Sequence, residues 1–293
     1  PKLPTFIADS VPGITSVLPL MGVIAGAGLA LTVMGLLDDK TPFGPYRKLA
    51  GQIIICCIAA FHWKLRITLF WDVSFVTWMM TLCWLIFIVN AFNFCDNMDG
   101  LAAGIAVITA SLFTVVAAVN GQVFVAAIGA VTAGTSLGFY FFNRAPASIF
   151  MGDSGSHFIG FMLGVLGALT LFYKPPTQTM APLLIPVLIL ALPILDAFAV
   201  IFIRVRQKHP IMAGDHNHIS HRFVRLGMKP RTAVMTVHLL TLAIGLGALT
   251  LLWLDTIGVI LILLQTLVLL VFVSIIHRYP ITQDAGHGTD NAP

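Results

Sequence analysis

Apolar stretches of about 20 residues recur along the chain, and short polar or Pro/Gly-containing segments such as 41–45 and 174–176 separate them. A helix needs about 20 apolar residues to cross the roughly 30 Å hydrocarbon core of a bilayer. The pattern therefore predicts about nine membrane-spanning helices, at residues 17–37, 49–63, 73–94, 100–119, 122–142, 155–173, 180–203, 231–253 and 256–276.

The composition supports a membrane protein and excludes most other classes. Hydrophobic residues make up 58% of the 293 positions and charged residues only 10%, against about 25% in ordinary soluble domains. The mean hydropathy of +0.96 is far too high for a disordered chain. We expect an all-α polytopic bundle, with one integral membrane domain over residues 1–278 and a polar tail over 279–293. The four cysteines have no metal-ligand spacing and are expected to be small buried residues.

The positive charges define a topology. Nine spans place alternate connections on opposite sides of the membrane. Twelve of the 16 Lys and Arg residues fall on one side and four on the other. The positive-inside rule assigns the richer side to the cytoplasm. Its connections are residues 38–48, 95–99, 143–154, 204–230 and the C-terminal tail, and the count of twelve includes Arg231 at the start of the eighth span.

All 12 acidic residues are aspartates, and five of them gather on the predicted cytoplasmic side: Asp38, Asp39, Asp96, Asp99 and Asp153. A single Asp at a helix start is readily explained as a cap of free backbone N–H groups. Several carboxylates on one face repel each other, and a divalent cation relieves that repulsion. Oxygen ligands without Cys favour Mg²⁺, with Mn²⁺ as the alternative, over Zn²⁺.

Polar residues recur at every third position from Asn90 to Asp99. In an unbroken helix such positions drift by about 60° per step, so their side chains converge only if the helix breaks near 94–97 and a new one starts near 99–100. The segment Gly152–Ser156 also precedes a predicted helix. The free N–H groups of a helix start suit an anion such as phosphate.

The connection 204–230 is basic, and with Arg231 it holds seven Lys or Arg residues and four His residues. It is interpreted either as a loop that anchors to anionic lipid headgroups or as a clamp for a polyphosphate. A zinc site from His216, His218 and His221 is a further alternative. Asp196 lies within a span and is either a structural partner for Asn or Arg or a residue close to the polar cavity.

Four motifs together resemble the polyprenyl-phosphate N-acetylhexosamine-1-phosphate transferase superfamily (glycosyltransferase family 4). The nearest branch is that of the bacterial undecaprenyl-phosphate GlcNAc-1-phosphate transferases. The motifs are Asp38-Asp39 with Lys48, Asn90-x-x-Asn93-x-x-Asp96-x-x-Asp99-Gly100, Phe150 to Ser156, and Asp215-x-x-His218-x-x-His221-Arg222. The resemblance implies that a membrane lipid phosphate attacks a UDP-N-acetylhexosamine, with Mg²⁺, to give lipid diphosphate-sugar and UMP.

The resemblance also implies roles for the polar residues nearest the expected chemistry. Asp38 and Asp39 match an aspartate pair that deprotonates or positions the lipid phosphate. Lys48 matches a phosphate-binding lysine, and Asn93 and Asp153 match metal-binding positions. Because both reactants are anions, phosphoryl transfer needs charge neutralisation and positioning above all.

The remaining matches concern the sugar nucleotide. Asp96 and Asp99 match nucleoside-contacting positions, and Phe150 matches an aromatic residue that stacks on uracil. A cytoplasmic segment that holds the diphosphate is matched by His218, His221 and Arg222. Ser220 stands where many relatives have a histidine, and the lack of a triple-His run favours the GlcNAc branch over the MurNAc-pentapeptide transferases.

The expected location is the bacterial inner membrane, with a multi-pass chain and the active site facing the cytoplasm. Undecaprenyl phosphate, the UDP-sugar and the bilayer are the expected partners; no nucleic acid is expected, and the relatives suggest a homodimer. The resemblance leads us to expect two further spans before residue 1. The alternatives are a MurNAc-pentapeptide phosphotransferase, a transporter that uses the aspartates for ion coupling, and a non-catalytic homologue.

Overall fold

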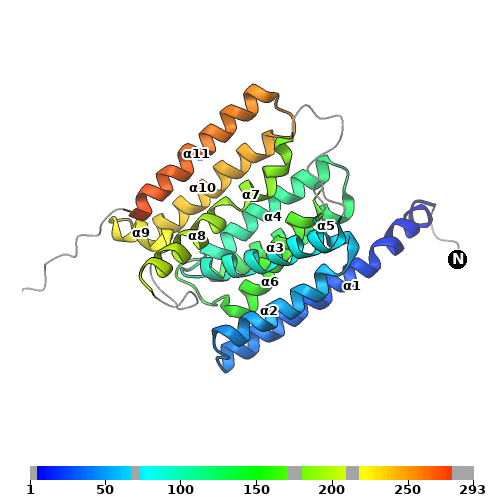
Figure 1. The fold of residues 1–293 in the computed structure, drawn as a ribbon, viewed down its shortest axis with the longest axis horizontal. Helices are drawn as coiled ribbons and strands as arrows, with labels where there is room; N and C mark the ends of the chain where they lie inside the picture. The colour runs from blue at the N-terminus through cyan, green and yellow to red at the C-terminus, as the bar shows by residue number, and fades with distance from the viewer. Residues whose placement is uncertain (1–4, 68–72, 171–179, 209–217, 279–293) are drawn as a thin grey trace, which may run out of the picture.

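A computed structural model of the protein describes residues 5–67, 73–170, 180–208 and 218–278, and within these ranges it is helical without any strand (Figure 1). The two short 3₁₀ helices are Trp63–Leu65 and Ala181–Leu184. The α-helices are α1 (Thr5–Lys40), α2 (Pro45–Ala60), α3 (Ser74–Cys95), α4 (Leu101–Val119), α5 (Val123–Asn143), α6 (Gly152–Leu169), α7 (Ile185–Ile189), α8 (Ala191–Arg206), α9 (Ile219–Arg225), α10 (Pro230–Thr250) and α11 (Thr256–Arg278).

The helices confirm a polytopic membrane bundle, although not the predicted number of spans. Six helices in the described residues are long and apolar enough to cross a bilayer: α1, α3, α4, α5, α10 and α11. A seventh span results if the 3₁₀ turn with α7 and the following α8, which meet at a bend of 67°, are counted as one. Helix α2 has only 16 residues, and α6 starts with a polar segment. Each of the nine predicted segments contains a helix, and the count of nine stays a prediction.

The centre of the bundle is formed by α4, which packs against α5 on one side and α10 on the other. Its sequence begins Leu-Ala-Ala-Gly-Ile-Ala, and small residues let neighbouring helices approach closely where lipid gives little hydrophobic driving force. Helix α6 packs between α1 and α3. The outer face of α1 exposes Leu29, Val33 and Leu36, as expected of a helix in contact with lipid.

Alternation of helix direction brings the polar connections to one end of the bundle (Figure 1). Helices α1, α3 and α5 end there, and α2, α4, α6 and α10 begin there, with α9 beside them. We call this the site end. Of the four cysteines, which are all free, Cys56 and Cys95 are buried as predicted, whereas Cys57 is partly buried and Cys83 is exposed.

Candidate active site

The turn between α1 and α2 places two aspartates and a lysine together. The backbone N–H of Phe43 donates to Asp38 Oδ1 at 2.7 Å and so closes the turn. Gly44 has φ +80°, a conformation that favours glycine, immediately before α2 begins at Pro45. Lys48, in the first turn of α2, directs its Nζ to Asp38 Oδ2 at 3.6 Å and also makes an ion pair with Asp153.

The end of α3 contributes the next side chain. The amide Nδ2 of Asn93 donates to Asp153 Oδ1 at 2.7 Å and to Ser156 Oγ at 2.9 Å. Helix α3 ends at Cys95 and α4 begins at Leu101, so the break that the spacing of polar residues predicts is confirmed. Because of this break, Asn93 lies in the last turn of α3 and reaches the first turn of α6.

The first turn of α6 is capped by Asp39 from the end of α1. Its two carboxylate oxygens accept the backbone N–H groups of Asp153 at 3.0 Å and Ser154 at 3.3 Å. The negative charge lies at the positive end of the α6 dipole, which stabilises both. Gly152 has φ +63°, and a Cβ there would lie 2.8 Å from Asp39 Oδ2, so a side chain at this position would displace the cap.

Gly35 permits the close approach of α1 to this turn. A Cβ at Gly35 would lie 2.5 Å from the backbone N of Ser154. We expect Gly35→Ala to push α1 away from α6 and to lower the free energy of unfolding by about 1–3 kcal/mol, as overpacking does elsewhere. Thermal denaturation in detergent measures the change.

Gly26→Ala is the matched control for Gly35→Ala. Gly26 lies in the same helix, and a Cβ there meets nothing within 4 Å. Because alanine is the better helix former by up to about 1 kcal/mol, this control is expected to be neutral or stabilising. Equal midpoints for the two variants would contradict the contact between α1 and α6.

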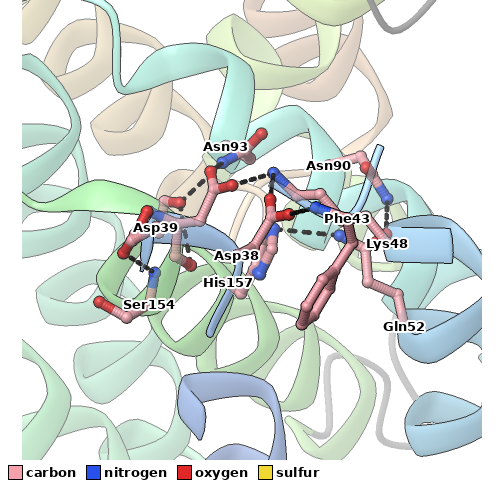
Figure 2. Close-up of polar contacts among 11 residues, drawn as sticks. Asp38, Asp39, Phe43, Lys48, Gln52, Asn90, Asn93, Ser154 and His157 are labelled. Atoms are coloured by element: carbon pink, nitrogen blue, oxygen red, sulfur yellow. Dashed lines mark hydrogen bonds and ion pairs between the residues drawn. The ribbon is translucent and has the colours of Figure 1, made fainter. Parts of the chain in front are cut away.

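Figure 2 shows that these side chains converge from α1, α2, α3 and α6. We call this set the aspartate–lysine cluster, and it consists of Asp38, Asp39, Lys48, Asn93 and Asp153. The cluster contains three carboxylates and one ammonium group, which pairs with Asp38 and Asp153, so it has an excess of negative charge. The side chains of Lys48, Asp38 and Asp153 keep 11–24% of their surface exposed. A cavity of about 200 Å³ lies beside the cluster, lined by Asp38, Lys48, Asn93 and Phe94 among others.

The donor set suits a hard cation better than a zinc ion. Asp153 offers carboxylate oxygens. Asn93 offers an amide oxygen, which a rotation of the amide group can direct toward a cation. In proteins, Mg²⁺ is commonly held by one or two such ligands together with substrate phosphates and water. Among the described residues, no group of three or more His, Cys, Asp or Glu side chains is arranged to hold a metal by itself. Asp153 and Asn93 could therefore contribute oxygen ligands to a Mg²⁺ ion only together with ligands from outside this cluster.

Two of the predicted nucleoside contacts, Asp96 and Asp99, lie beside the cluster rather than in it. Asp96 follows the last residue of α3, and burial, with a contribution from the charge of Asp153, raises its pKa to about 6. Asp99 Oδ2 accepts the N–H of Ala147 at 3.0 Å and so fixes the connection between α5 and α6. The side chain of Phe150, near the end of that connection, is 75% exposed.

Asp99 also lines a cavity of about 560 Å³ between the end of α5 and the start of α10. Arg144 and Arg231 share the lining with the aromatic residues Tyr140 and Phe142. The cavity thus offers cationic and aromatic groups near one carboxylate, which is chemistry suited to an anionic ligand with a planar ring.

The predicted diphosphate-holding residues lie on and just before α9. Asp196 Oδ2 pairs with His218 Nδ1 at 2.7 Å, and Asp196 Oδ1 accepts the N–H of Ile219 at 2.8 Å. Asp196 therefore orients His218 and docks the start of α9. Ser220 donates to Asn97 Oδ1 at 2.7 Å, so α9 is also held against the break after α3.

An aromatic residue lies between α9 and the aspartate–lysine cluster. The Phe94 ring is 6.3 Å from the His218 ring, centre to centre, and the buried Arg204 lies 5.2 Å above Phe94. The His221 ring is 6.4 Å from that of His218, and Arg222 follows on the same short helix. The predicted residues Asp215 and His216, and with them part of the zinc alternative, lie outside the described residues.

Sequence reasoning missed several polar residues of the site. Gln52 stands alone in an apolar segment, and His157 directly follows the polar motif that ends at Ser156, so only their contacts reveal a role. His157 is buried and hydrogen bonded to Gln52 at 3.1 Å. The sequence does contain one signal for them, which is spacing. Gln52 follows Lys48 by four residues and His157 follows Asp153 by four, so each lies on the same helix face as a predicted site residue.

The fold and the site define a polytopic helical membrane protein with a cluster of aspartates, a lysine and a basic His-containing helix at one end of the bundle. The chain belongs to glycosyl transferase family 4, whose model matches residues 21–171. It is 35% identical over 241 residues to a Bacillus subtilis protein named probable undecaprenyl-phosphate N-acetylglucosaminyl 1-phosphate transferase, covering 79% of this chain and 66% of that protein.

Two further relatives extend the comparison. A decaprenyl-phosphate N-acetylglucosaminephosphotransferase of Mycobacterium leprae is 30% identical over 278 residues, which cover 83% of this chain and 68% of that protein. A phospho-N-acetylmuramoyl-pentapeptide-transferase of Lacticaseibacillus paracasei is 40% identical over 134 residues, 42% of this chain and 41% of that protein. The chain thus spans about two thirds of the length of the first two relatives.

Proposed function

We propose that the protein transfers N-acetylglucosamine 1-phosphate from UDP-GlcNAc to undecaprenyl phosphate, with Mg²⁺, and releases UMP at the cytoplasmic face of a bacterial plasma membrane. The observation that carries the proposal is the meeting of Lys48, Asn93 and Asp153 from three helices at the site end. The printed names of the relatives support the acceptor class and the sugar phosphate.

In the proposed reaction an oxygen of the lipid phosphate attacks the phosphorus that carries the sugar. The new P–O bond joins lipid phosphate to sugar phosphate, and the bond to the bridging oxygen of the UDP diphosphate breaks, so that UMP leaves with that oxygen. A Mg²⁺ ion bound by Asp153 and Asn93 supplies charge neutralisation for the diphosphate. No covalent intermediate on the protein is required.

Other side chains of the site bind or position the substrates in this proposal. The Lys48 ammonium lines the cavity of about 200 Å³ beside the cluster, where it would bind the phosphate of the lipid. Asp38 holds Lys48 in this position. Asp39 keeps the start of α6 in place through its two backbone hydrogen bonds. His218, held by Asp196, lies on the other side of Phe94 and faces the same end of the bundle. The Lys48 ammonium beside the reacting phosphates reduces their mutual repulsion.

A radiolabelled transfer assay tests the proposal. Membranes containing the protein receive labelled UDP-GlcNAc and undecaprenyl phosphate, and the expected result is Mg²⁺-dependent formation of labelled lipid with stoichiometric UMP. Labelled UDP-MurNAc-pentapeptide in a parallel reaction tests the second candidate, which the Lacticaseibacillus paracasei relative favours. Absence of lipid-linked label with both donors would refute the proposed transfer and leave the transporter or non-catalytic alternatives.

A further inference from the structure

A second polar set lies one helical turn from the aspartate–lysine cluster, on the side away from the site end. The Nδ2 of Asn90 donates to Gln52 Oε1 at 2.8 Å, and the Nε2 of Gln52 donates to His157 Nε2 at 3.1 Å (Figure 2). Gln52 and His157 are fully buried. These three residues come from α2, α3 and α6, the same helices that supply Lys48, Asn93 and Asp153.

The two sets correspond residue by residue. Gln52 follows Lys48 by four positions, Asn90 precedes Asn93 by three, and His157 follows Asp153 by four. Residues three or four apart lie on the same face of a helix, about one 5.4 Å turn apart. Because α3 runs toward the site end while α2 and α6 start there, all three offsets point in the same direction, into the bundle.

The hydrogen-bond roles within this set are determined by its own geometry. Asn90 Nδ2 also donates to the Ile86 carbonyl at 2.9 Å, so its amide nitrogen faces Gln52. Gln52 must then accept with Oε1 and donate with Nε2, which makes His157 Nε2 an acceptor and its imidazole neutral. A shift of any one helix along its axis breaks at least one of these bonds.

Packing alone does not require polar residues at these positions. Buried hydrogen-bonded groups add little net stability, and apolar side chains of the same shape often serve equally well. Hydrogen bonds between membrane helices are worth about 0.6 kcal/mol on average. Such groups do specify one alignment of the helices, because alternative alignments leave buried polar atoms unpaired.

We propose that Gln52, Asn90 and His157 form a positioning layer that fixes the relative register of α2, α3 and α6 and thereby the spacing of Lys48, Asn93 and Asp153. The layer touches no substrate and acts through the residues one turn above it. The expected effect of the layer on catalysis rests on the proposed function. The alignment itself is a property of the three helices.

The principal variants are Gln52→Met and Asn90→Leu, which keep side-chain size and remove the layer's hydrogen bonds. In lipid nanodiscs, we expect kcat for lipid-linked product to fall by about 10- to 100-fold, as when a residue that orients a metal ligand is replaced. The KM for UDP-GlcNAc and the thermal midpoint should change little. His157→Gln retains an acceptor for Gln52 and is expected to keep most of the activity.

Trp84→Phe is the matched control. The Trp84 indole donates to the Gly164 carbonyl at 2.9 Å, so this variant also removes a hydrogen bond between α3 and α6, farther from the site end. It is expected to retain the wild-type kcat. Wild-type kcat in both Gln52→Met and Asn90→Leu, or an equal loss in Trp84→Phe, would overturn the positioning layer.

A second measurement separates this inference from the proposed function. Hydrogen–deuterium exchange of the peptide 150–158 reports on the backbone N–H groups of Asp153 and Ser154, which donate hydrogen bonds to the Asp39 carboxylate. We expect several-fold faster exchange in Gln52→Met and unchanged exchange in Trp84→Phe. If the wild-type protein transfers no sugar phosphate, the proposed function fails, and the exchange result still decides the layer: equal exchange in Gln52→Met and wild type would overturn it.

Discussion

Asp153→Asn is expected to lower kcat for transfer of sugar phosphate by about 10³-fold or more, while the protein still folds and inserts into the membrane. The side chain of Asp153 contacts both Lys48 and Asn93, and it is the proposed carboxylate ligand of Mg²⁺. Removal of a single preorganised group that stabilises transition-state charge costs about 10²–10³ in other enzymes, and loss of the metal adds to this. The measurement is UMP release from UDP-GlcNAc at saturating Mg²⁺.

The fold should survive this substitution because no charge is left buried and alone. Lys48 keeps Asp38 as a partner at 3.6 Å, and an asparagine can still accept from Asn93. Asp255→Asn is the matched control: Asp255 caps the start of α11, away from the site end, through its bond to the Gly258 N–H at 2.9 Å. Full activity in Asp153→Asn would remove this residue from the catalytic machinery and the metal assignment with it.

Lys48→Met is expected to lower kcat/KM for undecaprenyl phosphate by about 10²-fold, with a smaller effect on the KM for the sugar nucleotide. The ammonium group lies between Asp38 and Asp153, and without it two carboxylates face an incoming phosphate with no cation between them. Methionine retains the length and apolar character of the stem, so the packing of α2 changes little. Steady-state kinetics with each substrate varied in turn measure the effect.

Two further lysine variants make this expectation specific. Lys48→Arg keeps the charge but not the compact geometry of an ammonium, so it should restore only part of the activity. Lys64→Met removes a lysine near the opposite end of the bundle, where its Nζ donates to the Ser16 carbonyl at 2.7 Å, and it should leave the transfer rate unchanged. If Lys48→Met and Lys64→Met had the same effect, a specific phosphate-binding role for Lys48 would be wrong.

The positions of the cluster residues were predictable to different degrees. The spacing of Asn90 to Asp99 predicts a helix break, and α3 does end at Cys95. The grouping of Asp39, Asn93 and Asp153 at one end follows from the alternation of spans, and the structure brings them into hydrogen-bond contact. Asp99 lies at the same end of the bundle, as predicted. Its side chain does not bond to these three residues but accepts the N–H of Ala147 and so fixes the α5–α6 connection.

The pairings between single polar residues could not be predicted. Gln52 and His157 are 105 positions apart; Gln52 stands alone in an apolar segment, and His157 lies where the polar motif gives way to the apolar part of α6. Their contact depends on how far α2 slides along α6, and hydropathy carries no information on that register. The partnership of Asp196 with His218 depends in the same way on the docking of α9 against α8.

The sequence by itself determined the membrane class, the helical architecture and the end of the bundle where the charged residues collect. These follow from the cost of placing charge in hydrocarbon and from the length of a helix that spans it, both of which are local properties of the chain. Only the tertiary structure decided which of the collected side chains touch, because contact is set by the rotation and axial position of packed helices. Gly35 and Gly152 illustrate the difference: the close approach of α1 to α6 that they permit exists only once both helices are in place.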